Sequence, residues 1–182
     1  MNDQLYKKEQ QAYIRYANET RGLVINHTIL LERIMDECIA GYFFKNSDTR
    51  TELIEVLISS ETLTYSSKVN LFVRLLKKIY TPEVFIKKYV GMAKELQEIA
   101  TDRNKFAHQI IVLDLTIEDF HKTAICLVDF KEMKTGNFYS PDKIKEIIDK
   151  VRKYVKIIDQ IKQDITGIGN PREVVSENNA TQ

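Results

Sequence analysis

Residue types that mark several familiar protein classes are scarce in this chain of 182 residues, which has two cysteines, three prolines, six glycines and three histidines. Cys38 and Cys126 lie alone in apolar surroundings, and their spacing resembles neither a metal site nor a disulfide framework. Such isolated cysteines are typical of a reducing compartment. We therefore expect two buried free thiols.

Long apolar runs are also missing. No segment approaches the roughly 18 apolar residues that a membrane-spanning helix needs, and the N-terminal segment MNDQLYKKEQQAY has no apolar core of a secretory signal. These absences predict a cytoplasmic protein that makes no use of a membrane.

The chain has no excess of one charge, since 27 lysines and arginines face 26 acidic residues and the formal net charge is +1. This balance excludes a globally basic nucleic-acid scaffold but leaves local phosphate-binding patches open. Lysines cluster at Lys77, Lys78, Lys87 and Lys88, and again near Lys153. The simplest interpretation of both clusters is solvated helix faces.

The chain lacks the familiar catalytic and metal-binding patterns. It contains no glycine-rich phosphate loop, no His-Glu-x-x-His zinc helix, no Cys-x-x-Cys pair and no serine at a strand-to-helix elbow. Histidines at positions 27, 108 and 121 are too few for a multi-histidine metal site. We expect no metal and no cofactor.

What the sequence does contain is helical periodicity. Apolar residues recur at helical spacing from Leu5 to Phe44, which predicts one long helix or two abutting helices with Gly22 as the break. A turn at residues 46–48 and a short helix over 51–58 follow. Ser66 or Ser67 can then cap a helix that ends near Ile79.

The second half combines helices with strands. Thr81 and Pro82 open a helix that runs to His108, because proline is tolerated at the first helical position. Segments 110–117 and 123–133 are rich in β-branched residues and predict two strands, with a turn at 135–137. Pro141, after Ser140, begins a final amphipathic helix.

These elements predict a mainly α-helical fold with a small β-hairpin before the last helix. We expect one domain over residues 1–166, with the hairpin at about 110–134, and a flexible tail over 167–182.

The segment TDRNKFAHQ, residues 101–109, is the strongest indication of chemistry, because Arg103, Asn104 and His108 fall within six positions at a helix end. A structural explanation is also open. Phe106 and Ala107 would then pack inward, while Arg103 and His108 would interact with the negative end of the helix dipole.

The run from Arg103 to His108 resembles the Arg-x4-6-His motif of the HEPN superfamily, whose members are helical bundles in toxins, defence systems and RNA-processing enzymes. The upstream segments LLERIMDECIAGYFF and SSKVNLFVRLLKKI resemble the helix order of HEPN-like domains, including the mannitol-repressor-like branch. The resemblance covers about residues 21–108 and, more loosely, the last helix. Arg21 and His27 also fit the spacing, but no polar residue follows Arg21.

The resemblance implies metal-independent cleavage of RNA by attack of the ribose 2′-hydroxyl on the adjacent phosphate. His108 would transfer protons, Arg103 would stabilise charge on the phosphoryl oxygens, and Asn104 would orient His108 or the phosphate. RNA, a second copy of the chain and an antitoxin or regulatory protein are the expected partners. The alternative is a non-catalytic HEPN-like dimeric module or a transcription regulator resembling mannitol repressor.

Helix geometry constrains such a site. Five residues of α-helix rotate by about 140°, so Arg103 and His108 do not share a face, whereas Asn104 and His108 do. A site that uses all three requires the reach of arginine, a bent helix or a second subunit. The apolar excess of the first helix, which includes Ile29, Leu30, Ile34, Tyr42, Phe43 and Phe44, favours a homodimer through that helix or the motif helix.

Overall fold

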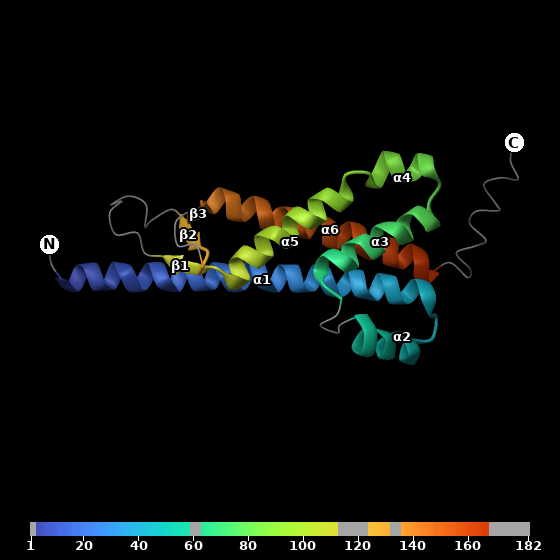
Figure 1. Cartoon of the computed structure of the whole chain (residues 1–182), viewed down its shortest axis with the longest axis horizontal. Helices are drawn as coiled ribbons and strands as arrows, with labels where there is room; N and C mark the ends of the chain where they lie inside the picture. The colour runs from blue at the N-terminus through green and yellow to red at the C-terminus, as the bar shows by residue number, and fades with distance from the viewer. Residues whose placement is uncertain (1–2, 59–62, 113–123, 132–135, 168–182) are drawn as a thin grey trace, which may run out of the picture. The chain divides into compact units, whose positions relative to one another are not determined.

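A computed structural model describes residues 3–58, 63–112, 124–131 and 136–167 of the chain. Its helices are α1 (Asp3–Phe43), α2 (Ser47–Leu53), the π-helical segment η1 (Ile54–Ile58), α3 (Tyr65–Ile79), α4 (Pro82–Tyr89), α5 (Met92–His108) and α6 (Pro141–Gly167). Its strands are β1 (Ile110–Val112), β2 (Ile125–Val128) and β3 (Gly136–Tyr139) (Figure 1). The mainly helical fold expected from the sequence is therefore confirmed.

The described residues form two compact units. The first contains Met1–Ile29 and Ile99–Val151, and the second contains Leu30–Glu98 and Arg152–Gln182. Helices α1, α5 and α6 each give one segment to either unit. Each unit is thus built from segments that are far apart in the sequence.

Long helix α1 runs without interruption through Gly22, so the single long helix is confirmed and the alternative of a break at Gly22 is wrong (Figure 1). Buried residues recur along it at intervals of three or four, and these are Tyr13, Ala17, Thr20, Val24, Thr28, Leu31, Met35 and Cys38. This spacing marks one continuous apolar face, and burial of that face offsets the cost of a single glycine in the helix.

Helix starts agree with the sequence in part. Asn46 caps α2 through its side chain, so Ser47 and Asp48 belong to the helix and not to a turn. Thr64 caps α3 by accepting a hydrogen bond from the Ser67 N–H at 3.2 Å. The caps expected at Ser66 or Ser67 are therefore wrong by a few residues.

The caps of the later helices are confirmed, but one expected helix is divided. Thr81 caps α4, with Pro82 in its first turn, and Ser140 accepts a hydrogen bond from the Lys143 N–H at 3.2 Å. The helix expected from Pro82 to His108 ends at Tyr89, and α5 begins at Met92. Gly91 separates them, in keeping with the poor helix propensity of glycine.

The sheet of the first unit has three antiparallel strands in the order β1-β2-β3. Ile110 pairs with Val128, and Ile125 pairs with Tyr139. The expected antiparallel pair is confirmed in β1 and β2, but the sheet is larger than expected, because a third strand over residues 136–139 begins inside the turn expected at 135–137. Segments 113–123 and 132–135 of the expected insertion, and 168–182 of the expected tail, lie outside the described residues.

The core of the first unit lies between α1, the sheet, the end of α5 and the start of α6. It contains Tyr13, Ala17, Val24, Phe106, Ile125, Leu127, Tyr139, Ile144, Ile147 and Ile148. The hydroxyl of Tyr13 joins α1 to the sheet, because it donates to the Val112 carbonyl at 3.4 Å and accepts from the Cys126 N–H at 3.2 Å. Val112 and Cys126 are paired residues of β1 and β2.

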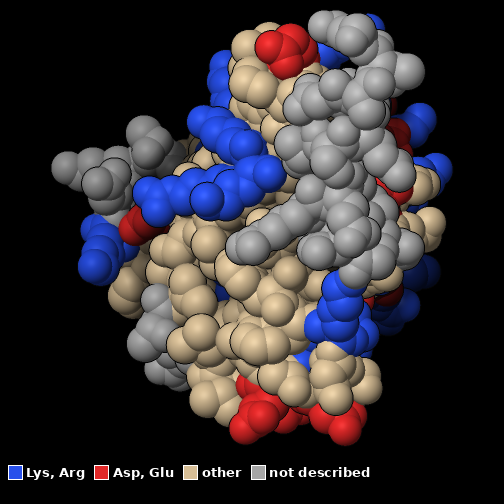
Figure 2. All heavy atoms as spheres, turned by 90° about the vertical axis from the view of Figure 1, so that its right-hand side faces the viewer, with Lys and Arg blue, Asp and Glu red and all other residues tan. Residues whose placement is uncertain are grey.

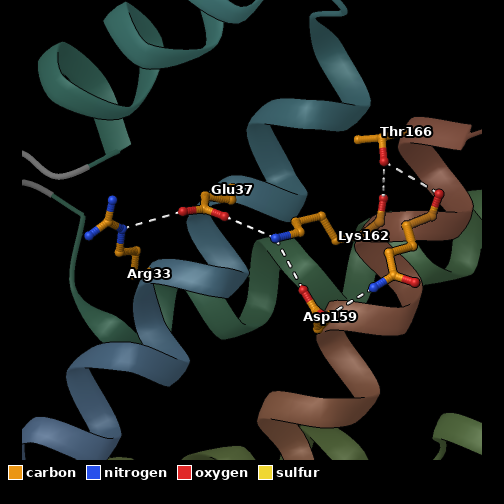
Figure 3. A network of polar contacts seen from close by, with 6 residues as sticks. Arg33, Glu37, Asp159, Lys162 and Thr166 are labelled. Atoms are coloured by element: carbon orange, nitrogen blue, oxygen red, sulfur yellow. Dashed lines mark hydrogen bonds and ion pairs between the residues drawn. The ribbon is translucent and has the colours of Figure 1, made fainter.

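In the second unit, α1 is linked to α3 and α6 by ion pairs. Lys68 on α3 lies 2.7 Å from Glu32 and 2.9 Å from Asp36 of α1, and the side chains of Lys68 and Asp36 are each only 5% exposed. Glu37 of α1 accepts hydrogen bonds from Arg33 and from Lys162 of α6, and Lys162 also contacts Asp159 (Figure 3).

Cys38 and Cys126 are both buried thiols that form no disulfide, as the sequence predicts.

Candidate active site

The last two turns of α5 separate a buried face from an exposed one. Phe106 is fully buried and its ring lies 4.7 Å from that of Tyr139, centroid to centroid. Asn104 and His108 are exposed. Because Phe106 fixes the rotation of the helix, the two polar side chains four residues apart point away from the core. The burial of Phe106, which belongs to the structural explanation of the motif, is confirmed, and His108 is exposed.

Arg103 lies at the border between these faces and is partly buried. Its Nη1 donates a hydrogen bond to the Oδ1 of Asn104 at 3.1 Å. The guanidinium thus turns toward the face that carries Asn104 and His108, although Arg103 itself starts about 140° away from His108 around the helix. The reach of arginine thus brings Arg103 to Asn104, while no hydrogen bond among the described residues joins either side chain to His108.

A residue from α1 also approaches this end of α5. Arg21 donates a hydrogen bond through Nη2 to the backbone carbonyl of Gln109, the residue after His108. The side chain of Gln109 in turn accepts a hydrogen bond from Asn137 of β3 at 3.2 Å. Two elements, α1 and β3, therefore hold the residue that follows His108. Sequence spacing gave no signal for this role of Arg21.

The alternative pair Arg21 and His27 does not form a comparable site. Nδ1 of the partly buried His27 lies 2.9 Å from the Leu23 carbonyl, one turn earlier in α1. Arg21 points instead to Gln109, and its buried Nε has no hydrogen-bond partner among the described residues. The two residues that share the spacing of the motif thus have separate local partners.

A carboxyl group lies near the motif on the other side of α5. Asp102 accepts a hydrogen bond from the Tyr139 hydroxyl at 3.4 Å. Burial raises the pKa of Asp102, and the nearby ammonium groups of Lys105 and Lys143 offset part of that rise. Burial and the Asp102 carboxylate raise the pKa of Tyr139. These groups link α5 to β3 and so support the orientation of the motif helix.

Within the described ranges, no group of three or more histidine, cysteine, aspartate or glutamate side chains is arranged to hold a metal ion. None of the helices in those ranges is both long and apolar enough to cross a membrane. The polar groups at this end of α5 are the guanidinium of Arg103, the amide of Asn104 and the imidazole of His108. No protein-family model, curated protein or solved structure matches this chain.

Proposed function

We propose that the chain is a HEPN-like, metal-independent endoribonuclease of toxin or defence type that acts in the cytoplasm. The observation that supports it is the exposed end of α5, where Arg103 is hydrogen-bonded to Asn104 and His108 faces away from the core. An exposed imidazole is available to a substrate, whereas a histidine kept for packing would be enclosed by aliphatic side chains.

In this proposal, the 2′-hydroxyl of a ribose attacks the adjacent phosphorus and the bond to the 5′-oxygen breaks. The products are a 2′,3′-cyclic phosphate and a 5′-hydroxyl. His108 accepts or donates the proton, since an imidazole titrates near neutrality. Arg103 stabilises the charge that develops on the phosphoryl oxygens, and Asn104 orients the guanidinium or the phosphate.

The test is incubation of the purified chain with mixed RNA in the presence of a chelator. Cleavage that leaves cyclic phosphate ends is expected. His108→Ala should reduce the rate by roughly two to four orders of magnitude, the usual contribution of such proton transfer. His27→Ala is the matched control and should keep most of the activity. Intact RNA at high protein concentration, or equal loss in both variants, would contradict the proposal.

A second candidate is a non-catalytic HEPN-like dimeric module or transcription regulator resembling mannitol repressor. The exposure of large apolar side chains on α1, among them Tyr16, Leu23 and Leu30, favours it. Contiguous exposed apolar patches usually mark a site where another protein binds. A homodimer fits both candidates, because an isologous interface would also bring two copies of the α5 motif together.

A further inference from the structure

Helices α3 and α4 and the start of α5 carry a local excess of positive charge. Residues 69–94 contain six cations and one acid, Glu83, which gives a local net charge of +5 in a chain whose net charge is +1. The six cations, named here the α3–α4 basic surface, are all exposed, and they are Arg74, Lys77, Lys78, Lys87, Lys88 and Lys94.

Within the described part of the chain, the six cations of this surface have no acidic partner, unlike several cations elsewhere. Lys143 pairs with Glu146, and Lys153 pairs with Glu95. No ion pair within the described residues involves any of the six cations, although Lys77 lies 5.3 Å from the centroid of the Phe85 ring. Their charges are therefore not compensated within this part of the protein.

The one acid within this stretch, Glu83, is bonded locally at the start of α4 and pairs with none of the six cations among the described residues. Hydrogen bonds from its own backbone N–H and from the Thr81 hydroxyl lower the pKa of Glu83. The carboxylate thus lies in the first turn of α4, at the positive end of the helix dipole, where an acid is stabilising.

The exposed face of α3 is polar along its length. Asn70, Arg74 and Lys77 follow one another at intervals of four and three residues, so they share a face, and Phe72 and Leu76 are buried on the opposite one. Lys77 reaches the ring of Phe85 and so joins this face to α4. Figure 2 shows Lys and Arg side chains on the upper left and middle of the face in view, with others at its edges and lower right.

We infer that the α3–α4 basic surface binds the phosphodiester backbone of single-stranded RNA. The choice of RNA rests on the proposed function, while the charge pattern itself does not. When unpaired cations of the protein neutralise phosphates, counterions condensed on the nucleic acid are released. This release supplies affinity that does not depend on the sequence. Arg74 adds a planar fork that matches phosphate, and Asn70 adds an amide donor beside it.

An anionic membrane is the competing occupant, because α4 exposes Ile86 and Val90 next to Lys87 and Lys88. A membrane surface needs apolar side chains that enter the lipid between the cations. The exposed face of α3 offers no large apolar side chain, although it carries three of the six cations. The observations therefore favour RNA.

The test measures binding of the full chain to a 2′-O-methyl oligoribonucleotide of about 20 nucleotides, which lacks the attacking hydroxyl and cannot be cleaved by the proposed mechanism. The variant replaces Arg74, Lys77 and Lys78 by glutamine. The control replaces Arg33, Lys143 and Lys153, which carry the same total charge but pair with acids. Circular dichroism checks that both triple variants remain folded.

The surface variant should bind roughly 10- to 100-fold more weakly, and the slope of log K against log salt should fall by about 2, near 0.7 for each lost phosphate contact. The control should keep its affinity and slope. Equal loss in both variants, no loss in the surface variant, or binding to phosphatidylserine vesicles without binding to the oligonucleotide would overturn the inference. Because cleavage is not measured, a failed nuclease proposal would not by itself produce any of these results.

Discussion

The hydroxyl of Tyr13 bonds to one residue of each of two paired strands. The stability of the first unit should therefore depend on this one oxygen atom. Tyr13→Phe removes that oxygen and leaves the Cys126 N–H and the Val112 carbonyl without this partner. We expect the free energy of unfolding to fall by about 1–3 kcal/mol, since buried polar groups are costly to leave unpaired. Urea unfolding measures the change.

Tyr16→Phe is the matched control for Tyr13→Phe. Tyr16 lies three residues later in the same helix and is exposed, so its hydroxyl can bond to water in either state. We expect a change below about 0.5 kcal/mol, as for other surface substitutions. Equal losses in the two variants would show that the bond to the sheet contributes nothing.

Asp36 makes stability depend on pH. Burial raises its pKa from 3.8 to about 6, against the opposing effect of Lys68, and the carboxylates of Glu32 and Glu37 add to the rise. The folded protein therefore holds a proton at Asp36 that the unfolded chain releases at lower pH. The contribution of Asp36 to stability is greatest below its unfolded pKa and is lost as pH rises through about 6.

Asp36→Asn should remove this pH dependence. The free energy of unfolding of the variant minus that of the wild type should increase by about 1–3 kcal/mol as the pH rises from about 4 to about 7. Two pKa units correspond to about 3 kcal/mol at most. Urea unfolding at several pH values measures the difference. The exposed Glu52→Gln serves as the control. A difference between Asp36→Asn and the wild type that stays constant with pH would refute the assignment.

Single residues could be predicted from the sequence where local pattern decides their environment. Helical spacing indicated that Asn104 and His108 share a face, the structural explanation of the motif had Phe106 packing inward, and isolated cysteines in apolar runs predicted buried thiols. The partner of Arg21 could not be predicted, because Gln109 lies 88 residues away. The residues near Arg21 do not indicate whether its side chain bonds to Gln109, just after the end of α5, or to His27.

Two glycines in different elements should respond in opposite ways to alanine. A Cβ at Gly22 meets no atom within 4 Å, so Gly22→Ala should raise the free energy of unfolding by about 0.5–1 kcal/mol through better helix propensity. A Cβ at Gly136 would lie 2.7 Å from the buried Cys126 sulfur. Gly136→Ala should therefore destabilise the pairing of β2 and β3.

Thermal and urea unfolding of the two alanine variants give the comparison, with the wild type in the same buffer. A destabilised Gly22→Ala variant would mean that α1 is not a regular helix at this position. An unchanged Gly136→Ala variant would mean that the sheet accommodates the added methyl group.

At the level of elements, the long periodic helices and the strands β1 and β2 could be predicted from the sequence, but β3 could not. Apolar spacing was enough for α1, α3 and α6, and hydroxyl side chains before Pro82 and Pro141 marked two helix starts. The sequence of β3, Gly-Asn-Phe-Tyr, begins with two residues that are typical of a turn. It becomes a strand because it pairs with β2, an interaction that local propensity does not contain.

For the whole molecule, we expect a homodimer that uses α1. Tyr16, Leu23 and Leu30 are exposed at intervals of seven residues in that helix, and Leu23 is 43% exposed. Light scattering at micromolar concentration should give twice the mass of one chain. Leu23→Asp should shift the protein toward monomer, because a buried charge weakens an apolar interface.

Ile86→Asp controls for the loss of an exposed aliphatic side chain, since Ile86 lies on α4 and is 62% exposed. This variant should keep the mass of the wild type. A monomeric wild type would rule out the arrangement in which two motif copies meet across a two-fold axis.

The fold class followed from composition and periodicity, but the division into two units did not. That division depends on which distant segments pack together, and helix periodicity identifies a buried face without identifying its partner. The HEPN-like assignment and the roles of Arg103, Asn104 and His108 stay proposals for the same reason, because a fold of this class does not determine chemistry.

The sharing of α6 between the units has a consequence for the order of events during synthesis. Ile144, Ile147 and Ile148 belong to the core of the first unit, while Ile158, Ile161 and Ile165 are buried in the second. At about 5–20 residues per second, the ribosome makes α6 roughly 10 s after the first half of α1. During that interval the apolar face of α1 has no complete core to join. The nascent chain is therefore a candidate for chaperone binding, and both units become complete only when the last helix emerges.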